Sequence, residues 1–202
     1  MPPKAPDGSR RVLLGAVLAA GLVAALAGTF LVTRRDAAPT GLAIGGPFTL
    51  EDPAGHAVTD RDLRGRYALI YFGYTFCPDV CPTTLNEVAG ALQDLGAKAD
   101  RLRPVFITID PRRDTPQVIG QYVAAFSPKL LGLTGTPQQV AQAAQDYRVY
   151  YAPHRTGPGP DDYTMDHSSI LYLIAPDGSF VAPIRADQTA SQMAADISQY
   201  LS

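Results

Sequence analysis

Apolar residues are most concentrated near the start of the chain. Residues 12–32 form a continuous run of 21 positions without a charged side chain. A helix rises about 1.5 Å per residue, so this run would span roughly 30 Å, the thickness of the hydrocarbon core of a bilayer. We therefore predict a transmembrane anchor at 12–32 after a cytoplasmic tail at 1–11. A cleaved signal peptide is the alternative, because the Ala-Leu-Ala stretch at 25–27 resembles a cleavage site and the Arg pair at 10–11 resembles a twin-arginine signal.

Beyond the anchor, the apolar pattern changes to short segments separated by turn residues. Residues 33–46 are rich in small residues, with Pro and Gly, and predict a flexible linker. After it, strand-like and helix-like segments alternate: a hairpin at 48–50 and 57–59, strands at 67–74, 105–109, 169–175 and 180–184, and helices at 83–95, 116–126, 137–147 and 189–201. This order predicts a parallel core with an antiparallel edge, and hence an α/β domain over 47–202 built as a thioredoxin-like three-layer sandwich.

Composition and charge narrow the class of partner. The 202-residue chain is 46% hydrophobic, enough to bury a core, and its net charge is -2. A chain with no basic excess is poorly suited to bind nucleic acid, so we expect no nucleic-acid partner. We also expect no small-molecule substrate. Only 11 residues precede the apolar run, too few for an ordinary mitochondrial presequence. The simplest interpretation is a protein of the bacterial inner membrane with its globular domain in the periplasm.

The two cysteines of the chain carry its clearest chemistry. Cys77 and Cys81 follow the segment at 67–74, whose nearly unbroken apolar pattern is typical of a central strand buried on both faces. They also precede a predicted helix, whose unpaired N–H groups and dipole favour a thiolate, so we expect the pKa values of both cysteines to be lowered. Two cysteines at this spacing are either a redox pair or metal ligands. Thiolates favour Cu(I), with zinc as the rival metal.

A third ligand has three candidates, His56, His154 and His167. His56 falls in the first predicted hairpin turn and His154 in a loop, so we interpret both as surface residues. His167 differs from them, since it precedes the predicted strand at 169–175, where thioredoxin-like folds approach their cysteine pair. Asp166 beside it is a candidate for orienting the imidazole.

Several motifs resemble the Sco (SenC) family in sequence and in order. They are Cys-Pro-Asp-Val-Cys-Pro at 77–82, Asp-Pro-Arg-Arg-Asp-Thr at 110–115, Phe-Ser-Pro-Lys-Leu at 126–130, Leu-Thr-Gly-Thr at 133–136, Tyr-Arg-Val-Tyr-Tyr at 147–151 and Asp-His-Ser at 166–168. The resemblance covers roughly residue 47 to the end of the chain. It implies that Cys77, Cys81 and His167 bind copper. It also implies a copper chaperone that helps to assemble the binuclear copper centre of cytochrome c oxidase, with the copper-bearing oxidase subunit as its partner.

Two further features of the resemblance concern residues near the ligands. Met165 stands where the family more often has an aliphatic residue, and we interpret it as a gap-filling core residue rather than a ligand. The chemistry of the segment 110–114 does not follow from its residues. We predict a strand-to-helix turn there with the side chains of 112–114 on the surface, and keep Asp110 as a candidate for orienting a ligand.

The main alternative function is thiol-disulfide exchange, in which Cys77 and Cys81 would be a redox pair, because the same lowered pKa suits both kinds of chemistry. The spacing of three residues between the cysteines and the lack of Trp weaken the interpretation as an ordinary thioredoxin. A peroxiredoxin would need Pro and Thr where this chain has Ile70 and Tyr74. A redox or copper sensor would use the same site as a chaperone. We therefore expect a copper chaperone rather than an enzyme, with these alternatives open.

Overall fold

The structure, a computed structural model, describes residues 44–201. The predicted tail at 1–11, the anchor at 12–32 and the linker as far as residue 43 lie outside the described residues. Within the described part, no helix combines the length and the apolar character needed to cross a membrane.

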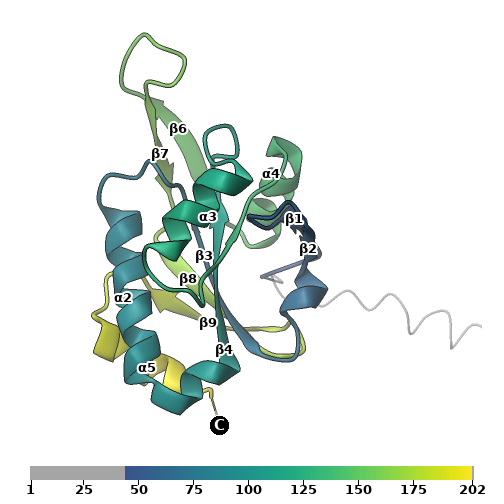
Figure 1. Ribbon diagram of the computed structural model, residues 1–202, viewed down its shortest axis with the longest axis vertical. Helices are drawn as coiled ribbons and strands as arrows, with labels where there is room; N and C mark the ends of the chain where they lie inside the picture. Colours follow the sequence, from purple (N-terminus) through teal and green to yellow (C-terminus); the bar gives the residue numbers. More distant parts are fainter. Residues whose placement is uncertain (1–43, 202) are drawn as a thin grey trace, which may run out of the picture. The chain divides into compact units, whose positions relative to one another are not determined.

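A five-stranded mixed sheet forms the centre of the domain (Figure 1). Its order is β5 (Leu131–Leu133), β4 (Leu102–Thr108), β3 (Tyr67–Gly73), β8 (Ile170–Ile174) and β9 (Phe180–Arg185). β3, β4 and β5 are parallel, whereas β8 is antiparallel to both β3 and β9. The predicted parallel core with an antiparallel edge is confirmed. Of these five strands the prediction missed only β5, a strand of three residues with a glycine at its centre.

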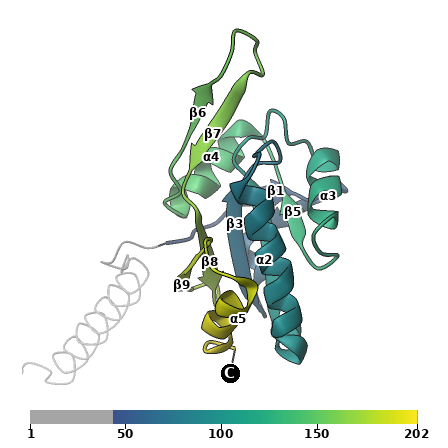
Figure 2. The same cartoon turned by 90° about the vertical axis from the view of Figure 1, so that its left-hand side faces the viewer.

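Helices cover both faces of this sheet and make three layers (Figure 2). α2 (Val80–Asp94), α3 (Pro116–Ala124) and α5 (Ala190–Ser198) lie on one face, and α4 (Pro137–Asp146) lies on the other. Phe106 of β4 meets Tyr122 of α3 with ring centroids 5.6 Å apart, while Phe72 of β3 meets Tyr147 at the end of α4 at 5.4 Å. Neighbouring side chains of a strand point to opposite faces, so each face of the sheet packs against its own helices.

The starts of the helices follow from local capping. α3, α4 and α5 each follow a threonine whose hydroxyl accepts a hydrogen bond from a backbone N–H in the first turn. α2 begins at Val80, three residues before the predicted position, and this places Cys81 inside its first turn. Two short 3-10 helices, η1 (Asp60–Leu63) and η2 (Gly96–Arg101), occupy connections between the main elements.

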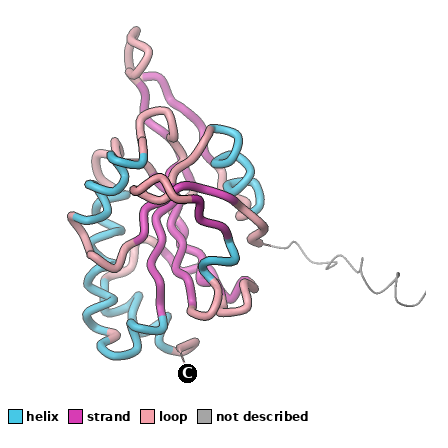
Figure 3. Tube along the Cα trace, turned by 45° about the vertical axis from the view of Figure 1, so that its right-hand side comes forward, coloured by secondary structure: helices cyan, strands magenta, loops and turns pink. Residues whose placement is uncertain are grey.

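Two hairpins flank the central sheet. The predicted first hairpin is confirmed as β1 (Thr49–Glu51) paired with β2 (Ala57–Thr59). The second, β6 (Tyr151–Arg155) paired with β7 (Tyr163–His167), projects beyond the sheet (Figure 3). The prediction of a loop around His154 is therefore wrong, because the residues rich in Gly and Pro form only the tip of a hairpin. Its register sets Tyr151 opposite His167, at the end of the hairpin nearest the body of the domain.

Candidate metal centre

The two cysteines lie where β3 ends and α2 begins. Cys77 is half-buried in the connecting loop, whereas Cys81 lies in the first turn of α2 and is completely buried. The backbone N–H of Cys81 donates a hydrogen bond to the sulfur of Cys77 across 3.4 Å, so the N-terminus of the helix faces that sulfur, as predicted. Gly73 leaves the necessary space, since a Cβ at this position would lie 2.9 Å from the sulfur of Cys81.

His167, the last residue of β7, completes the group. Its Nε2 lies 3.5 Å from the sulfur of Cys81, and the ligand atoms of Cys77, Cys81 and His167 all lie within 4.8 Å of one another. Its Nδ1 lies 3.0 Å from the backbone carbonyl oxygen of Ser168. Because a carbonyl only accepts hydrogen bonds, the proton of the neutral ring is on Nδ1, and Nε2 presents its lone pair to the sulfurs. This is the tautomer that metal ligation through Nε2 requires.

The other histidines and Asp166 lie outside this group. His56 is in the β1–β2 turn, and His154 is exposed on β6. Asp166 is exposed, and the alternation of side chains along β7 turns it away from the face that carries His167. The orienting role predicted for Asp166 therefore belongs to the carbonyl of Ser168.

Aromatic side chains surround the imidazole and the inner sulfur. The rings of Tyr71 and Tyr74 each meet the ring of His167 edge-on, with centroids 6.1 Å apart. The hydroxyl of Tyr71 also lies 3.8 Å from the sulfur of Cys81 as a hydrogen-bond donor. Met165 is buried in the hydrophobic core, in agreement with a gap-filling role. These contacts restrict the imidazole to an orientation that faces the cysteines.

The two sulfurs hold protons very differently. The thiol of Cys81 donates a hydrogen bond to Cys77, and this bond, with further donors from the backbone, lowers the pKa of Cys77 although the residue is partly buried. The same bond, together with burial, raises the pKa of Cys81, so the predicted lowering is wrong for this cysteine. The pair therefore shares one proton, which stays on the inner sulfur, and Cys77 is the thiolate at neutral pH.

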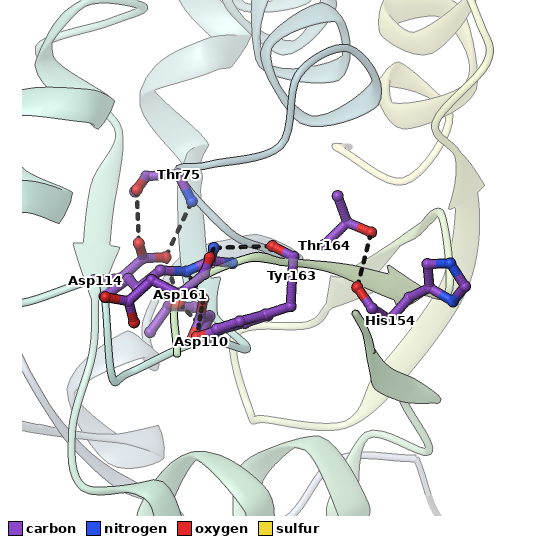
Figure 4. Close-up of polar contacts among 9 residues, drawn as sticks. Thr75, Asp110, Asp114, His154, Asp161, Tyr163 and Thr164 are labelled. Atoms are coloured by element: carbon purple, nitrogen blue, oxygen red, sulfur yellow. Dashed lines mark hydrogen bonds and ion pairs between the residues drawn. The ribbon is translucent and has the colours of Figure 1, made fainter. Parts of the chain in front are cut away.

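Asp114 fixes the cysteine loop to the sheet. It is completely buried, and its carboxylate accepts hydrogen bonds from the N–H of Thr75 at 3.0 Å, the hydroxyl of Thr75 at 2.6 Å and the hydroxyl of Thr108 at 2.6 Å (Figure 4). Burial raises the pKa of Asp114, and the three donors limit that rise. Because Thr75 leads into the cysteine loop and Thr108 ends β4, one carboxylate holds the two neighbouring strand ends together.

Arg113 joins the cysteine loop to the β6–β7 hairpin. Its guanidinium pairs with the carboxylate of Asp110 and donates a hydrogen bond to the backbone carbonyl of Tyr163 at 2.9 Å. It also lies 3.7 Å from the centre of the Tyr163 ring and 4.7 Å from that of Phe76, in the cysteine loop. The hydroxyl of Tyr163 in turn donates to Asp110 at 2.8 Å (Figure 4). We call these four residues, Phe76, Asp110, Arg113 and Tyr163, the arginine clamp.

The surface position predicted for the side chains of 112–114 is wrong for two of the three. Arg112 is exposed, but the side chain of Arg113 is only 9% exposed and Asp114 is fully buried. The sequence does contain a signal for the burial of Asp114. Thr75 and Thr108 lie at the ends of adjacent parallel strands, where their hydroxyls can donate to a buried carboxylate. Arg113 had no such local signal, because its hairpin partner Tyr163 lies 50 positions away along the chain. Asp110, predicted to orient a ligand, acts on the hairpin through the clamp.

The family profile described as SCO1/SenC matches residues 36–202. The chain belongs to the SCO1/SenC family. It is 44% identical over 162 residues to the human mitochondrial protein SCO1 homolog, an alignment that covers 78% of this chain and 53% of that protein. The chain thus spans about half the length of this SCO1 relative.

Two further relatives support the assignment to the SCO1/SenC family. A SCO2-like protein of Rickettsia prowazekii is 40% identical over 150 residues, covering 74% of this chain and 73% of that protein. The structure of Bradyrhizobium japonicum ScoI, solved with copper bound, is 47% identical and superimposes with a TM-score of 0.72, covering 78% of this chain and 99% of that one. The predicted thioredoxin-like α/β fold is confirmed.

Replacing Asp114 tests whether the buried carboxylate holds this SCO1/SenC domain together. Asp114→Asn turns one acceptor oxygen into a donor that faces Thr75 or Thr108, so we expect the free energy of unfolding to fall by about 2 kcal/mol. Urea denaturation followed by circular dichroism measures this change. Asp161→Asn, at an exposed position, is the matched control and should unfold like the wild type. Equal stability of both variants would contradict the role given to Asp114.

The reactivity of the cysteines tests the proton distribution in the SCO1/SenC site. Because the pKa of Cys77 is lowered, its thiolate persists below pH 8, and iodoacetamide should modify Cys77 at a nearly constant rate down to about pH 6. An ordinary thiol with a pKa of about 8.5 loses roughly tenfold in rate per pH unit over this range. Peptide mapping by mass spectrometry reports each cysteine separately, and Cys81 should stay unmodified. A tenfold fall per pH unit at Cys77 would contradict the assignment.

Proposed function

We propose that this protein is a copper chaperone that binds one copper ion through Cys77, Cys81 and His167. The observation that supports this most directly is the convergence of the three ligand atoms within 4.8 Å. Two thiolates and one imidazole are a donor set that suits copper, because soft sulfur favours Cu(I) and imidazole accepts both oxidation states. The similar Bradyrhizobium japonicum protein was solved with copper bound, which agrees with the proposal.

Three donors also favour copper over a structural zinc ion. Among residues 44–201, no fourth His, Cys, Asp or Glu joins this group. Structural zinc sites have four protein ligands, whereas Cu(I) is satisfied by three. Cys77 and His167 are only partly buried, so a ligand from another protein can approach the ion. An incomplete, accessible site of this kind suits a protein that gives up its metal.

The proposed role of this site is to deliver copper to another protein. We place the apolar run at 12–32 in the bacterial inner membrane as an anchor, with 1–11 in the cytoplasm and the linker at 33–46 leading to the copper-binding domain in the periplasm. An anchored domain on a flexible linker searches the space next to the membrane. The proposed recipient is the copper-bearing subunit of cytochrome c oxidase, as the family resemblance implies. Membership of the SCO1/SenC family supports this recipient.

Thiol-disulfide exchange is the second candidate, favoured by the unequal pKa values of the two cysteines. The thiolate of Cys77 would attack a partner disulfide, and Cys81 would then displace the partner from the mixed disulfide. The partner gains two electrons and two protons, and this pair ends as a disulfide. Such a reaction could prepare the thiols of the recipient for copper. Thiol-disulfide exchange does not require the lone pair of His167, whereas copper binding does. The two functions can therefore be distinguished by replacing His167.

Copper titration against a competing chelator tests the proposal. Cys77→Ser, Cys81→Ser and His167→Ala should each weaken Cu(I) or Cu(II) binding by about 100-fold or more, because each removes a direct ligand. His154→Ala, a histidine exposed on the same β6–β7 hairpin, is the matched control and should bind like the wild type. Wild-type affinity in all three ligand variants would refute the copper site. Unchanged affinity in His167→Ala alone, with copper lost in both cysteine variants, would favour the thiol-exchange function.

A further inference from the structure

A pocket of about 360 Å³ lies between the β6–β7 hairpin and the body of the domain. Residues 109–112, which follow β4, and Pro137, at the start of α4, line it from the body, and residues of both β6 and β7 line it from the hairpin. Its lining contains none of Cys77, Cys81 and His167, so this pocket is separate from the proposed copper site. Its volume falls in the range of small-molecule sites, roughly 300–1000 Å³.

The lining of the pocket is mostly apolar because of the register of the hairpin. Pro153 pairs with Met165 and Arg155 with Tyr163, and directly paired residues project to the same face of two strands. These four side chains face the pocket, whereas His154 lies between them on the other face. Met165 and Tyr163 are buried and form the floor. Rigid proline rings without an N–H group complete the walls: Pro111, Pro137, Pro153 and Pro160.

Two arginines in the lining have no acidic partner. Arg112 and Arg155 are both exposed, and within residues 44–201 neither guanidinium pairs with a carboxylate. Arg155 donates to the backbone carbonyls of Pro158 and Gly159, at 3.4 Å and 2.8 Å, which leaves its charge without a counterion. A guanidinium has five N–H donors in a fixed planar arrangement. Both side chains therefore keep charge and donors for an anion in the pocket.

The one acidic side chain in the lining is already engaged. Asp110 is buried, and its carboxylate pairs with Arg113 and accepts a hydrogen bond from the hydroxyl of Tyr163 (Figure 4). Asp161 and Asp162 lie nearby at the tip of the hairpin, outside the lining. The carboxylate of Asp162 accepts a backbone N–H within the tip at 2.8 Å. The lining itself therefore combines apolar surface with a surplus of positive charge.

We infer that this pocket binds a small organic carboxylate with an apolar body, an aryl or alkyl group. The body covers the tyrosine, methionine and proline surfaces, and the carboxylate pairs with Arg112 and Arg155. A guanidinium matches a carboxylate through two parallel hydrogen bonds. A doubly charged phosphate would need more donors than these two side chains to offset its loss of water, so the lining favours a carboxylate. This binding is reversible and non-covalent, and it goes beyond the proposed function.

Isothermal titration calorimetry of the full-length, metal-free protein in a neutral detergent tests this inference, with titrations into detergent alone subtracted. Phenylbutyrate has the proposed apolar body and carboxylate, phenylbutyramide has the body without the charge, and acetate has the charge without the body. The test variant carries Arg112→Gln and Arg155→Gln together, which removes both charges and keeps polar side chains at exposed positions. Arg101→Gln, at an exposed arginine in η2, is the matched control.

We expect phenylbutyrate to bind the wild type and Arg101→Gln with a dissociation constant of roughly 1 mM or less. The amide and acetate should each bind at least about tenfold more weakly, because each lacks one half of the contacts. The double variant should bind the acid and the amide equally. No binding of phenylbutyrate by the wild type, equal binding of acid and amide, or an unchanged preference in the folded double variant would overturn the inference. Cys77→Ser should bind phenylbutyrate like the wild type, so a failure of the proposed copper site would leave this result unaffected.

Discussion

The buried guanidinium of Arg113 is the contact on which the candidate metal centre depends. Two ligands come from the junction of β3 and α2, whereas His167 lies 86 positions after Cys81, on a hairpin that projects from the sheet. Arg113 touches both elements. Burying its charge is costly, and the carboxylate of Asp110, the carbonyl of Tyr163 and two aromatic faces offset that cost. The third ligand is thereby held near the other two.

The remainder of the site divides its tasks among different interactions. Asp114 positions the cysteine loop on the sheet, and the N-terminus of α2 favours a thiolate at Cys77. The carbonyl of Ser168 selects the tautomer of His167, so that its lone pair faces the sulfurs. All of these groups are in place in the protein alone. A site arranged in this way need not reorganise when it takes up an ion, which favours binding through entropy.

The sequence predicted the parts of the fold that depend on local pattern. The apolar segment at 67–74 indicated a buried strand, and the predicted starts of α3, α4 and α5 lie within one residue of the observed ones. The position of the cysteine pair at the start of a helix was also predicted from the sequence. The β6–β7 hairpin was missed, since Pro153 and the residues at its tip obscure strand periodicity. The clamp was missed because its members meet only in the folded chain, and the choice of His167 relied largely on family resemblance.

Electron paramagnetic resonance of the Cu(II)-loaded protein tests the central claim, that Arg113 holds His167 to the cysteines. Lys cannot reproduce the planar contacts of a guanidinium, so Arg113→Lys should weaken or abolish the nitrogen coupling of His167 while sulfur-to-copper absorption remains. Arg112→Lys, at the exposed neighbouring position, is the matched control and should keep the nitrogen coupling. Circular dichroism shows that each variant is folded. A folded Arg113→Lys variant with the nitrogen coupling of the wild type would contradict the account.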